Sequence, residues 1–200
     1  MPEISLTDFV DFVAKAGTPK LTKVRQLKER GEYEPASDFW KPLREAIIEF
    51  HRKGGRDKHQ LDRILTGLTD PKKQNRYPEA IDGYKKFLGR KQIRWFDPFK
   101  TSWSSAGLDV RINPELGLII SAERHVIKLY FKDEKLEKRK VDVVLALMEE
   151  TLRQNIEPSD RIAILDVSGN ALFQSSGPNP DLMPLLAGEA AAFVTMWDQT

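Results

Sequence analysis

The segment from Leu108 to Lys132 reads LDVRI, NPE, LGLII, SAER and HVIKLYFK, and it carries the clearest strand pattern in the chain. Apolar and polar residues alternate along its longer runs, which is typical of half-buried antiparallel strands. The two short runs hold turn-forming residues. We therefore expect a three-stranded meander, with one loop at Asn113–Glu115 and the other at Ser121–Arg124.

The meander has a preferred register, because a slip of one residue would turn every apolar side chain towards water. Placing the apolar residues on one face sets Val110 opposite Leu118, and Leu118 opposite Leu129. The other face then carries two rows of residues, namely Asp109, Ile119 and Lys128 in one row and Arg111, Gly117 and Tyr130 in the other. Since Gly117 has no side chain, a shallow gap would separate Arg111 from Tyr130.

This second face supplies the candidate ligand-binding residues Asp109, Arg111, Lys128 and Tyr130. Three arrangements remain open for it. It lies in water, as the polar face of an antiparallel sheet usually does, or the N-terminal helices cover it, or it holds a ligand. An enclosed pocket with carboxylates would favour an enzyme or a small-ligand protein, whereas an open face would favour a binding module.

The rest of the C-terminal half alternates helix and hairpin. A helix is expected from Asp133 or Glu134 to Gln154, then strands at 162–167 and 171–175 with Gly169 supplying the positive φ of their turn, and a last helix ending near Trp197. The predicted fold is therefore α+β, with an N-terminal helical region packed on a C-terminal antiparallel sheet. The order of that sheet domain is three-strand meander, helix, hairpin, helix.

The first ninety residues are predicted to be helical, because capping residues, glycines and prolines divide them into amphipathic segments. The expected helices run from Ser5 to Gly17, from Thr18 to Gly31, from Pro35 to Lys53, from Asp57 to Leu68 and from Pro78 to Leu88. Pro42 would move the start of the third helix towards Phe39 or Trp40.

The junction between the halves is rich in aromatic residues and is a poor flexible linker. We therefore divide the chain into a helical region 1–92, an aromatic junction 93–105 and an α+β sheet domain 106–200. Exposing the junction's rings would be unfavourable, so we expect the three parts to unfold as one cooperative unit.

Composition limits the chemistry of the chain. Of its 200 residues, 40% are hydrophobic and 31% are charged, and none is cysteine, which excludes disulfides, thiol catalysis and cysteine-bound zinc. No secretory signal pattern and no apolar run of about 18 residues is present, so we expect a cytoplasmic protein without a membrane partner.

Positive charge gathers in the first half, where residues 1–105 hold 22 Lys and Arg against 15 Asp and Glu. Within 72–100, cations alternate with aromatic residues, a mixture that nucleic-acid binding needs. The candidate nucleic-acid-binding residues are Lys72, Lys73, Arg76, Lys85, Lys86, Arg90, Lys91 and Arg94. A solvated helix face with aromatic residues in the core explains the same pattern.

No motif of a known chemistry is present. His51, His59 and His125 do not have metal-ligand spacing, and the chain has no nucleophile elbow, phosphate loop or dinucleotide fingerprint. We therefore expect no cofactor and no metal. The sequence favours a non-catalytic, macromolecule-binding or regulatory module with a protein or nucleic-acid partner. The alternative is an enzyme or small-ligand-binding protein with its site between the helical half and the polar sheet face.

Overall fold

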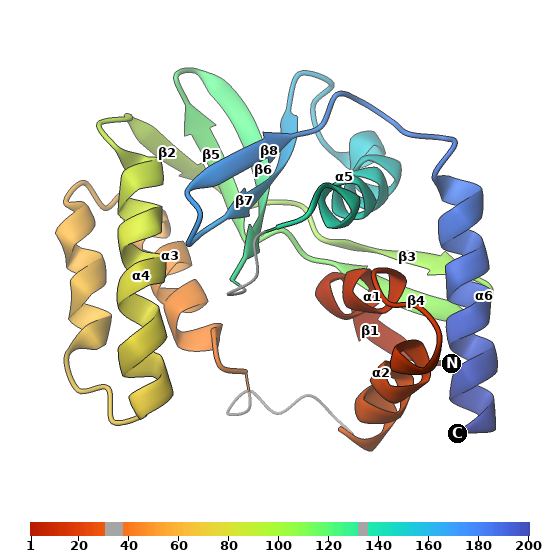
Figure 1. Ribbon diagram of the computed structural model, residues 1–200. Coiled ribbons are helices and arrows are strands. Elements are labelled where there is room, and N and C mark those ends of the chain that lie inside the picture. Colours follow the sequence, from red (N-terminus) through yellow and green to blue (C-terminus); the bar gives the residue numbers. More distant parts are fainter. Residues whose placement is uncertain (31–37, 132–135) are drawn as a thin grey trace.

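The computed structural model describes residues 1–30, 38–131 and 136–200 and shows the predicted α+β class, built on two sheets (Figure 1). Sheet A has the strand order β1-β4-β3, and sheet B has the order β2-β5-β6-β7-β8. The strands are β1 (Glu3–Ser5), β2 (Ile93–Phe96), β3 (Thr101–Ser105), β4 (Leu108–Ile112), β5 (Leu116–Ile120), β6 (Glu123–Tyr130), β7 (Arg161–Asp166) and β8 (Ala171–Gln174). The helices are α1 (Leu6–Val13), α2 (Thr18–Glu29), α3 (Lys41–Arg52), η2 (Lys58–Leu65), α4 (Pro71–Leu88), α5 (Lys138–Leu152), η3 (Arg153–Asn155) and α6 (Met183–Gln199).

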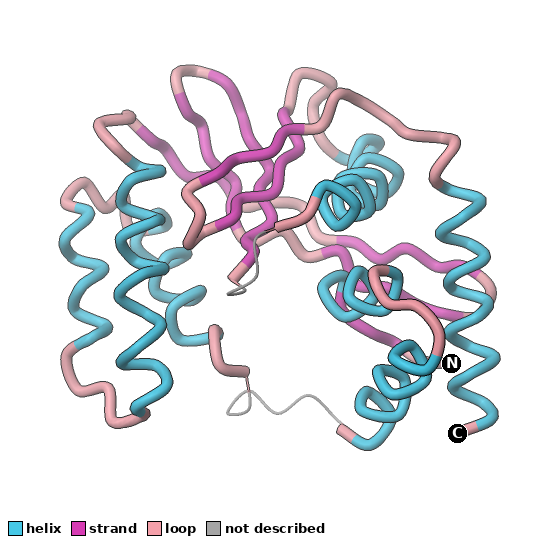
Figure 2. The backbone as a smooth tube through the Cα atoms, in the orientation of Figure 1, coloured by secondary structure: helices cyan, strands magenta, loops and turns pink. Residues whose placement is uncertain are grey.

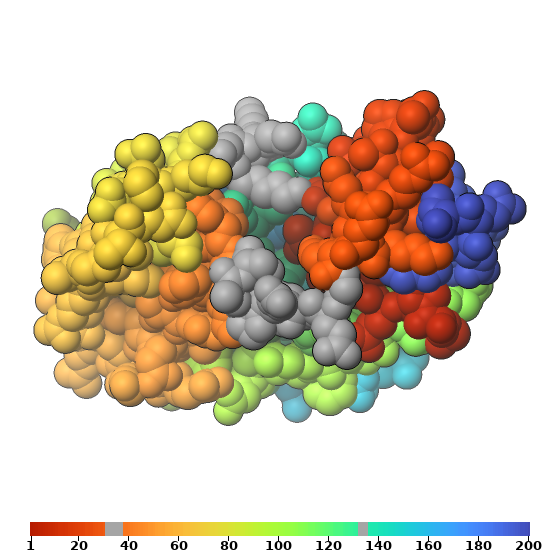
Figure 3. Space-filling model, turned by 90° about the horizontal axis from the view of Figure 1, so that it is seen from below, coloured from red at the N-terminus to blue at the C-terminus, as the bar shows by residue number. Residues whose placement is uncertain are grey.

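Sheet B lies in the middle of the molecule with helices on both sides (Figure 2). Helices α3 and α4 lie on one side of it, and α5 packs against β7 on the other. Helix α5 also contacts β3 and β4, so it lies between the two sheets. Seen from below, the surface is hollowed between the helix pair α1–α2 and the helix pair α3–α4 (Figure 3).

The alternation of side chains along sheet B divides the core into two clusters. Leu118 of β5 and Leu165 of β7 belong to the cluster under α3 and α4. Val126 of β6 and Ile164 of β7 point the other way, into the cluster formed with α1, α5, α6 and sheet A. Both faces of these strands are therefore buried, so exposure to water, one of the three arrangements left open for the second face, is not the one observed on β6 and β7.

The predicted three-strand meander is wrong at its first hairpin. Strand β4 pairs with β1 on one side, Val110 lying opposite Ile4, and with β3 on the other, Val110 lying opposite Trp103. Both edges of β4 are thus occupied inside sheet A, and β5 starts a different sheet. Strands β1 and β3 are short, and the sequence of β3 is polar, so neither produced a strand signal.

The second hairpin exists with a different register. Leu116 lies opposite Ile127 and Leu118 opposite His125, because the turn has only two residues, Ser121 and Ala122. Their φ values are 52° and 70°, a conformation usually adopted by Asn and Gly. The pairing moves by four residues relative to the prediction, and an even shift leaves each side chain on its predicted face.

Sheet B is mixed rather than antiparallel. Strands β6 and β7 are parallel, which requires the long crossover that α5 provides. The predicted hairpin of β7 and β8 is confirmed. Its positive φ of 51° belongs to Asn170, whereas Gly169 donates its backbone N–H to Asp166 Oδ1 at 3.0 Å.

The N-terminal helices follow the prediction with one large change. Helix α4 begins at Pro71, seven residues before the predicted Pro78, because Asp70 caps it by accepting hydrogen bonds from the backbone of Lys72 and Lys73. Helix α3 starts next to Trp40, as Pro42 suggested. The predicted helix boundaries at Gly31, Pro35, Asp133 and Glu134 and the strand end at Lys132 lie outside the described residues. Among the described helices, none combines the length and apolar character needed to cross a membrane.

Candidate functional site

The structure separates the four residues predicted to bind a ligand. Asp109 and Arg111 lie on β4 in sheet A, where Arg111 Nη1 is 3.4 Å from Glu3 Oε1. Lys128 and Tyr130 lie on β6 in sheet B. Because β4 and β5 belong to different sheets, the two predicted rows of residues do not form.

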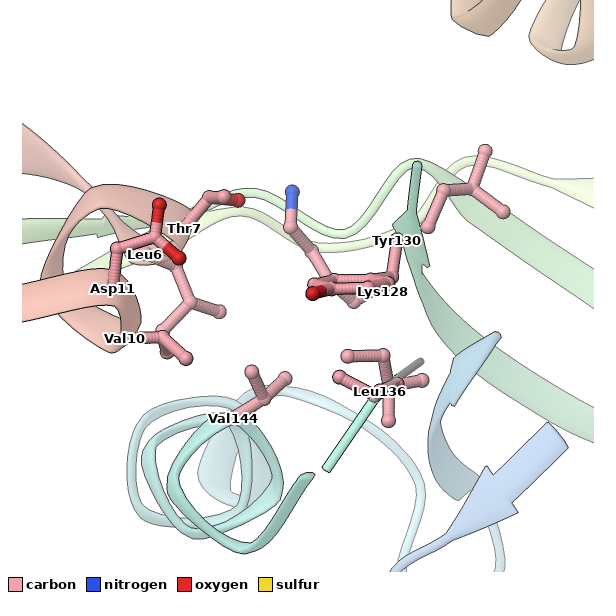
Figure 4. A pocket seen from close by; sticks show the side chains of 10 residues that line it. Leu6, Thr7, Val10, Asp11, Lys128, Tyr130, Leu136 and Val144 are labelled. Atoms are coloured by element: carbon pink, nitrogen blue, oxygen red, sulfur yellow. The ribbon is translucent and has the colours of Figure 1, made fainter. Parts of the chain in front are cut away.

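Lys128 and Tyr130 line a small pocket between β6, α1 and α5. Thr7 and Asp11 of α1 face them across this pocket (Figure 4). The rest of the lining is apolar and consists of Leu6, Val10, Leu129, Leu136, Val144 and Ile164. The pocket has a volume of about 10 Å³, which is room for one water molecule.

The charge of Lys128 is satisfied inside the fold. Its ammonium donates hydrogen bonds to the Glu115 carboxylate and to the carbonyl oxygen of Asn113, the latter at 3.2 Å. Glu115 also accepts a hydrogen bond from the backbone N–H of Leu129 at 2.7 Å. This partly buried ion pair fixes the loop that joins sheet A to sheet B. In the described parts of the chain, no three His, Asp or Glu residues gather closely enough to hold a metal ion.

The eight predicted nucleic-acid-binding cations form two groups along and beyond α4. Lys72, Lys73 and Arg76 lie in its first turns, whereas Lys85, Lys86, Arg90, Lys91 and Arg94 lie near its end, in the following turn and on β2. About 14 Å of helix separates Arg76 from Lys85, and two exposed acids, Glu79 and Asp82, lie within that stretch. Lys85 forms an ion pair with Asp62.

The aromatic residues between those cations belong to the core. Tyr77 and Tyr84 are completely buried, and Phe87 is nearly so. Tyr77 donates its hydroxyl hydrogen to the carbonyl oxygen of Phe39, and Tyr84 contacts His51, its hydroxyl oxygen lying 2.6 Å from Nε2. These rings are therefore not available to stack on nucleic-acid bases.

A much larger hollow opens where the chain passes from sheet B to sheet A, and we name it the junction groove. Its walls come from the connection between β2 and β3, the start of β6, and the segment after α5. The lining residues are Phe96, Asp97, Pro98, Phe99, Lys100, Arg124, Gln154, Asn155, Ile156 and Glu157. The groove is open to solvent and has a volume of about 710 Å³.

Three neighbouring strands build the floor of the junction groove. Phe96 of β2 lies opposite Gly117 of β5, where a Cβ atom would be 2.3 Å from the Phe96 carbonyl oxygen and 2.8 Å from its ring. Glycine therefore lets the ring lie directly on β5. The guanidinium of Arg124, on β6, lies 3.9 Å from the ring centroid. The gap predicted at Gly117 is thus filled by Phe96, and Arg124 instead of Arg111 covers an aromatic ring.

Arg124 is hydrogen-bonded to the buried Asp160, which belongs to a network with Arg153 and Glu149. Its Nε donates a hydrogen bond of 2.8 Å to Oδ1 of Asp160, whose side chain is 0% exposed. The Asp160 carbonyl oxygen accepts from Arg153 at 3.1 Å, and Arg153 donates two hydrogen bonds of 2.9 Å to the buried carboxylate of Glu149. The Glu149 hydrogen bonds also raise the pKa of Arg153. This network holds the Arg124 side chain in one position.

Two groups of the groove remain open to a partner. The Arg124 side chain is 39% exposed, and its Nη1 and Nη2 atoms donate no hydrogen bond to any residue of the described ranges. Phe99 is 42% exposed; within the described ranges, the other exposed large hydrophobic residues are Met1 and Leu185. The groove therefore offers a hydrogen-bonding edge beside an exposed ring.

Sequence reasoning missed Arg124 and Asp160 as site residues. It treated Phe96 and Phe99 as packing groups of the junction and also counted them among the rings interleaved with the basic residues of 72–100. The aromatic run from 93 to 105 was the available signal, since exposed rings beside cations are common at binding surfaces. Arg124 was assigned to a turn, and only the observed two-residue turn places it on a strand beside Phe96.

Comparison with models of known protein families gives no match, and comparison with curated proteins finds no similar sequence. The function is therefore inferred from the geometry and chemistry of the groove itself.

Proposed function

We propose that the protein is a non-catalytic binding module that holds an extended segment of a partner protein in the junction groove. The observation that carries this proposal is the presence of an exposed ring, Phe99, and a fixed guanidinium, Arg124, in one open groove. Aromatic and arginine side chains dominate the binding energy of many protein interfaces. Gln154 and Asn155 add donors and acceptors that suit the backbone of an extended peptide.

The size of the pocket beside Lys128 and Tyr130 argues against a small-ligand site there. The pocket beside Lys128 and Tyr130 measures about 10 Å³, whereas sites for organic ligands measure roughly 300–1,000 Å³. Lys128 is also engaged by Glu115, so it is not poised to act on a substrate. The volume of the junction groove, about 710 Å³, lies within that range, but the groove is open to solvent, which suits an extended chain that enters and leaves it.

The chemistry of the groove favours a polypeptide over a nucleic acid. One face of the Phe96 ring lies under Arg124 and its edge lies on Gly117, so Phe99 is the ring best placed to stack on a base. Asp97 and Glu157 also line the groove, and their carboxylates would repel a phosphate backbone. A polypeptide has no phosphate backbone and needs no ring for base stacking.

The proposal can be tested with a phage-displayed library of random peptides of about twelve residues, selected on the wild-type protein. Enriched peptides are synthesised with fluorescein, and their dissociation constants are measured by anisotropy. Phe99→Ala should weaken binding about tenfold or more, because it removes the exposed ring of the groove. Leu185→Ala on α6, where the leucine is 51% exposed, provides the matched control and should not change the affinity.

Failure to enrich any peptide that binds in solution would contradict the proposal. Equal affinities of the wild-type protein and the Phe99→Ala variant would also contradict it, as would an equal loss in the Leu185→Ala variant. A circular dichroism spectrum of each variant establishes that it is folded.

The nucleic-acid interpretation of the basic segment has its own test. Single-stranded and duplex oligonucleotides are titrated at low and moderate salt with the wild-type protein and with the Lys85/Lys86/Arg90 triple-alanine variant. Phosphate contacts release counterions, so genuine binding would weaken steeply as the salt concentration rises. We expect no binding that depends on these three residues.

A further inference from the structure

The guanidinium of Arg124 is preorganised for binding by contacts within the protein. The Phe96 ring fixes its position from one side, and Asp160 holds Nε. The two terminal nitrogens form the remaining edge of the guanidinium, and this edge has no hydrogen-bond partner in the described parts of the chain. A side chain fixed in this way loses little conformational entropy on binding.

We infer that this edge binds a carboxylate of the partner segment, so that the groove selects peptides with an aspartate or glutamate beside an apolar residue. The inference rests on the function proposed above and specifies which partner segments the groove binds. Two parallel N–H groups match the two oxygens of a carboxylate, and such bidentate pairs are stronger and more directional than single hydrogen bonds. Lys100 lines the same groove and adds a second positive charge.

The charges around Arg124 favour a carboxylate over a phosphate. Arg124 already neutralises the buried Asp160, and Asp97 and Glu157 line the groove. Asp97 is 3.4 Å from Arg52, which offsets its charge only in part because both groups are well exposed. A carboxylate brings one further negative charge to this setting, whereas a phosphate monoester brings nearly two. The charge balance of the groove therefore favours a carboxylate over a phosphate monoester.

The experiment uses the fluorescein-labelled peptides enriched on the wild-type protein, each paired with a version in which Asp and Glu are replaced by Asn and Gln. The wild-type protein should bind the acidic peptide about tenfold more tightly than its amide version, as expected for a charge-assisted pair. In the Arg124→Gln variant the two versions should bind almost equally. Arg161→Gln is the matched control, because Arg161 is an exposed arginine paired with Glu123 outside the groove, and it should leave the ratio unchanged.

Equal binding of the acidic and amide peptides by the wild-type protein would overturn the inference, even where Phe99→Ala still weakens both and the proposed function stands. Enriched peptides without any acidic residue would overturn it in the same way. An unchanged ratio of acidic-peptide to amide-peptide affinity in Arg124→Gln would show that a cation other than Arg124 binds the peptide carboxylate, and it would overturn the inference. The absence of binding peptides would overturn both the inference and the proposed function. Thermal unfolding shows whether Arg124→Gln folds; Arg124→Lys, which keeps the charge and loses the two-nitrogen edge, should also reduce the ratio and provides a second variant.

Discussion

The two faces of sheet B differ in how they are covered. On one face, Leu116, Leu118 and Leu129 lie in a continuous core beneath α3 and α4. On the other face, α5 packs along β7, but near β2 the sheet ends in Phe96 and Arg124 at the open junction groove. The same sheet thus has a sealed face and a partly open one.

The polar groups of the two faces differ in the same way. On the sealed side, His51 and Tyr84 contact each other within the core. On the open side, Asp160 accepts a hydrogen bond from Nε of Arg124, whereas Nη1 and Nη2 have no hydrogen-bond partner in the described parts of the chain. An arginine fixed on one edge and open on the other can serve the fold and a partner at once, which distinguishes it from a purely structural ion pair such as that of Lys128 and Glu115.

The largest expected effect is on the sealed face. Leu118→Ala and Leu129→Ala should each lower the free energy of unfolding by about 2–5 kcal/mol, because each leaves a cavity in the core. Arg111→Ala, on β4, the central strand of sheet A, removes a side chain that is 42% exposed and should cost about 1 kcal/mol or less. Urea unfolding measures all three. Equal losses at Leu118 and Arg111 would contradict this assignment of faces, and separate fluorescence and circular dichroism transitions in the wild-type protein would contradict a single cooperative unit.

The sealed face should also make stability depend on pH through His51. Burial lowers the pKa of His51 to about 4, from an ordinary value of 6.5. Between these values the unfolded chain binds a proton that the folded chain does not, so the free energy of unfolding should fall as the pH drops from 6.5 to 4. The expected contribution is about 3 kcal/mol, and it should level off below the folded pKa. Urea unfolding of the wild-type protein and His51→Gln across this range measures it, and identical pH slopes in the two proteins would refute the assignment.

On the open face, removing Arg124 should have a moderate effect on stability. Arg124→Ala should cost about 1–3 kcal/mol, because the buried Asp160 carboxylate loses its charged partner. Arg161→Ala removes a well-exposed pair with Glu123 and should cost about 1 kcal/mol or less. The two variants are compared by denaturant unfolding at neutral pH. A smaller loss of unfolding free energy for Arg124→Ala than for Arg161→Ala would show that the buried Asp160 carboxylate does not need Arg124 as its charged partner.

The smallest effect on stability is expected at Phe99. Its ring is 42% exposed, so Phe99→Ala should change the free energy of unfolding by about 1 kcal/mol or less. Thermal unfolding of the variant measures this. A loss as large as that of Leu118→Ala would show that the ring belongs to the core and would remove the basis for treating it as a binding group.

The sequence was sufficient to predict the elements with strong periodicity. The amphipathic patterns predicted most helices, and the apolar alternation predicted β4, β5, β6, β7 and β8. It also predicted which face each residue of β5 and β6 occupies, since the observed register differs by an even number of residues. These features depend on local spacing alone.

The pairing of the strands was not predictable in the same way. Strand β4 pairs with residues more than a hundred positions earlier in the chain, and nothing in the loop Asn113–Glu115 shows that it crosses between sheets. The turn at Ser121 and Ala122 uses positive φ values without glycine, so its length was misjudged. The junction groove depends on both features, because they decide where Phe96 and Arg124 meet. Of the predicted ligand residues, Lys128 and Tyr130 do share a pocket, but it is too small for an organic ligand.

The most direct measurement is to map an enriched peptide onto the protein by its effect on backbone amide resonances in ¹H–¹⁵N correlation spectra. If the junction groove is the binding site, the largest changes should fall on the amides of residues 96, 97, 99 and 100, of Arg124 and of residues 154–157, which are far apart in sequence and meet only in the groove. The amides of α6 around Leu185 should move little. Changes concentrated on α6, on the outer side of α4 or around Lys128 and Tyr130 would contradict the proposed site.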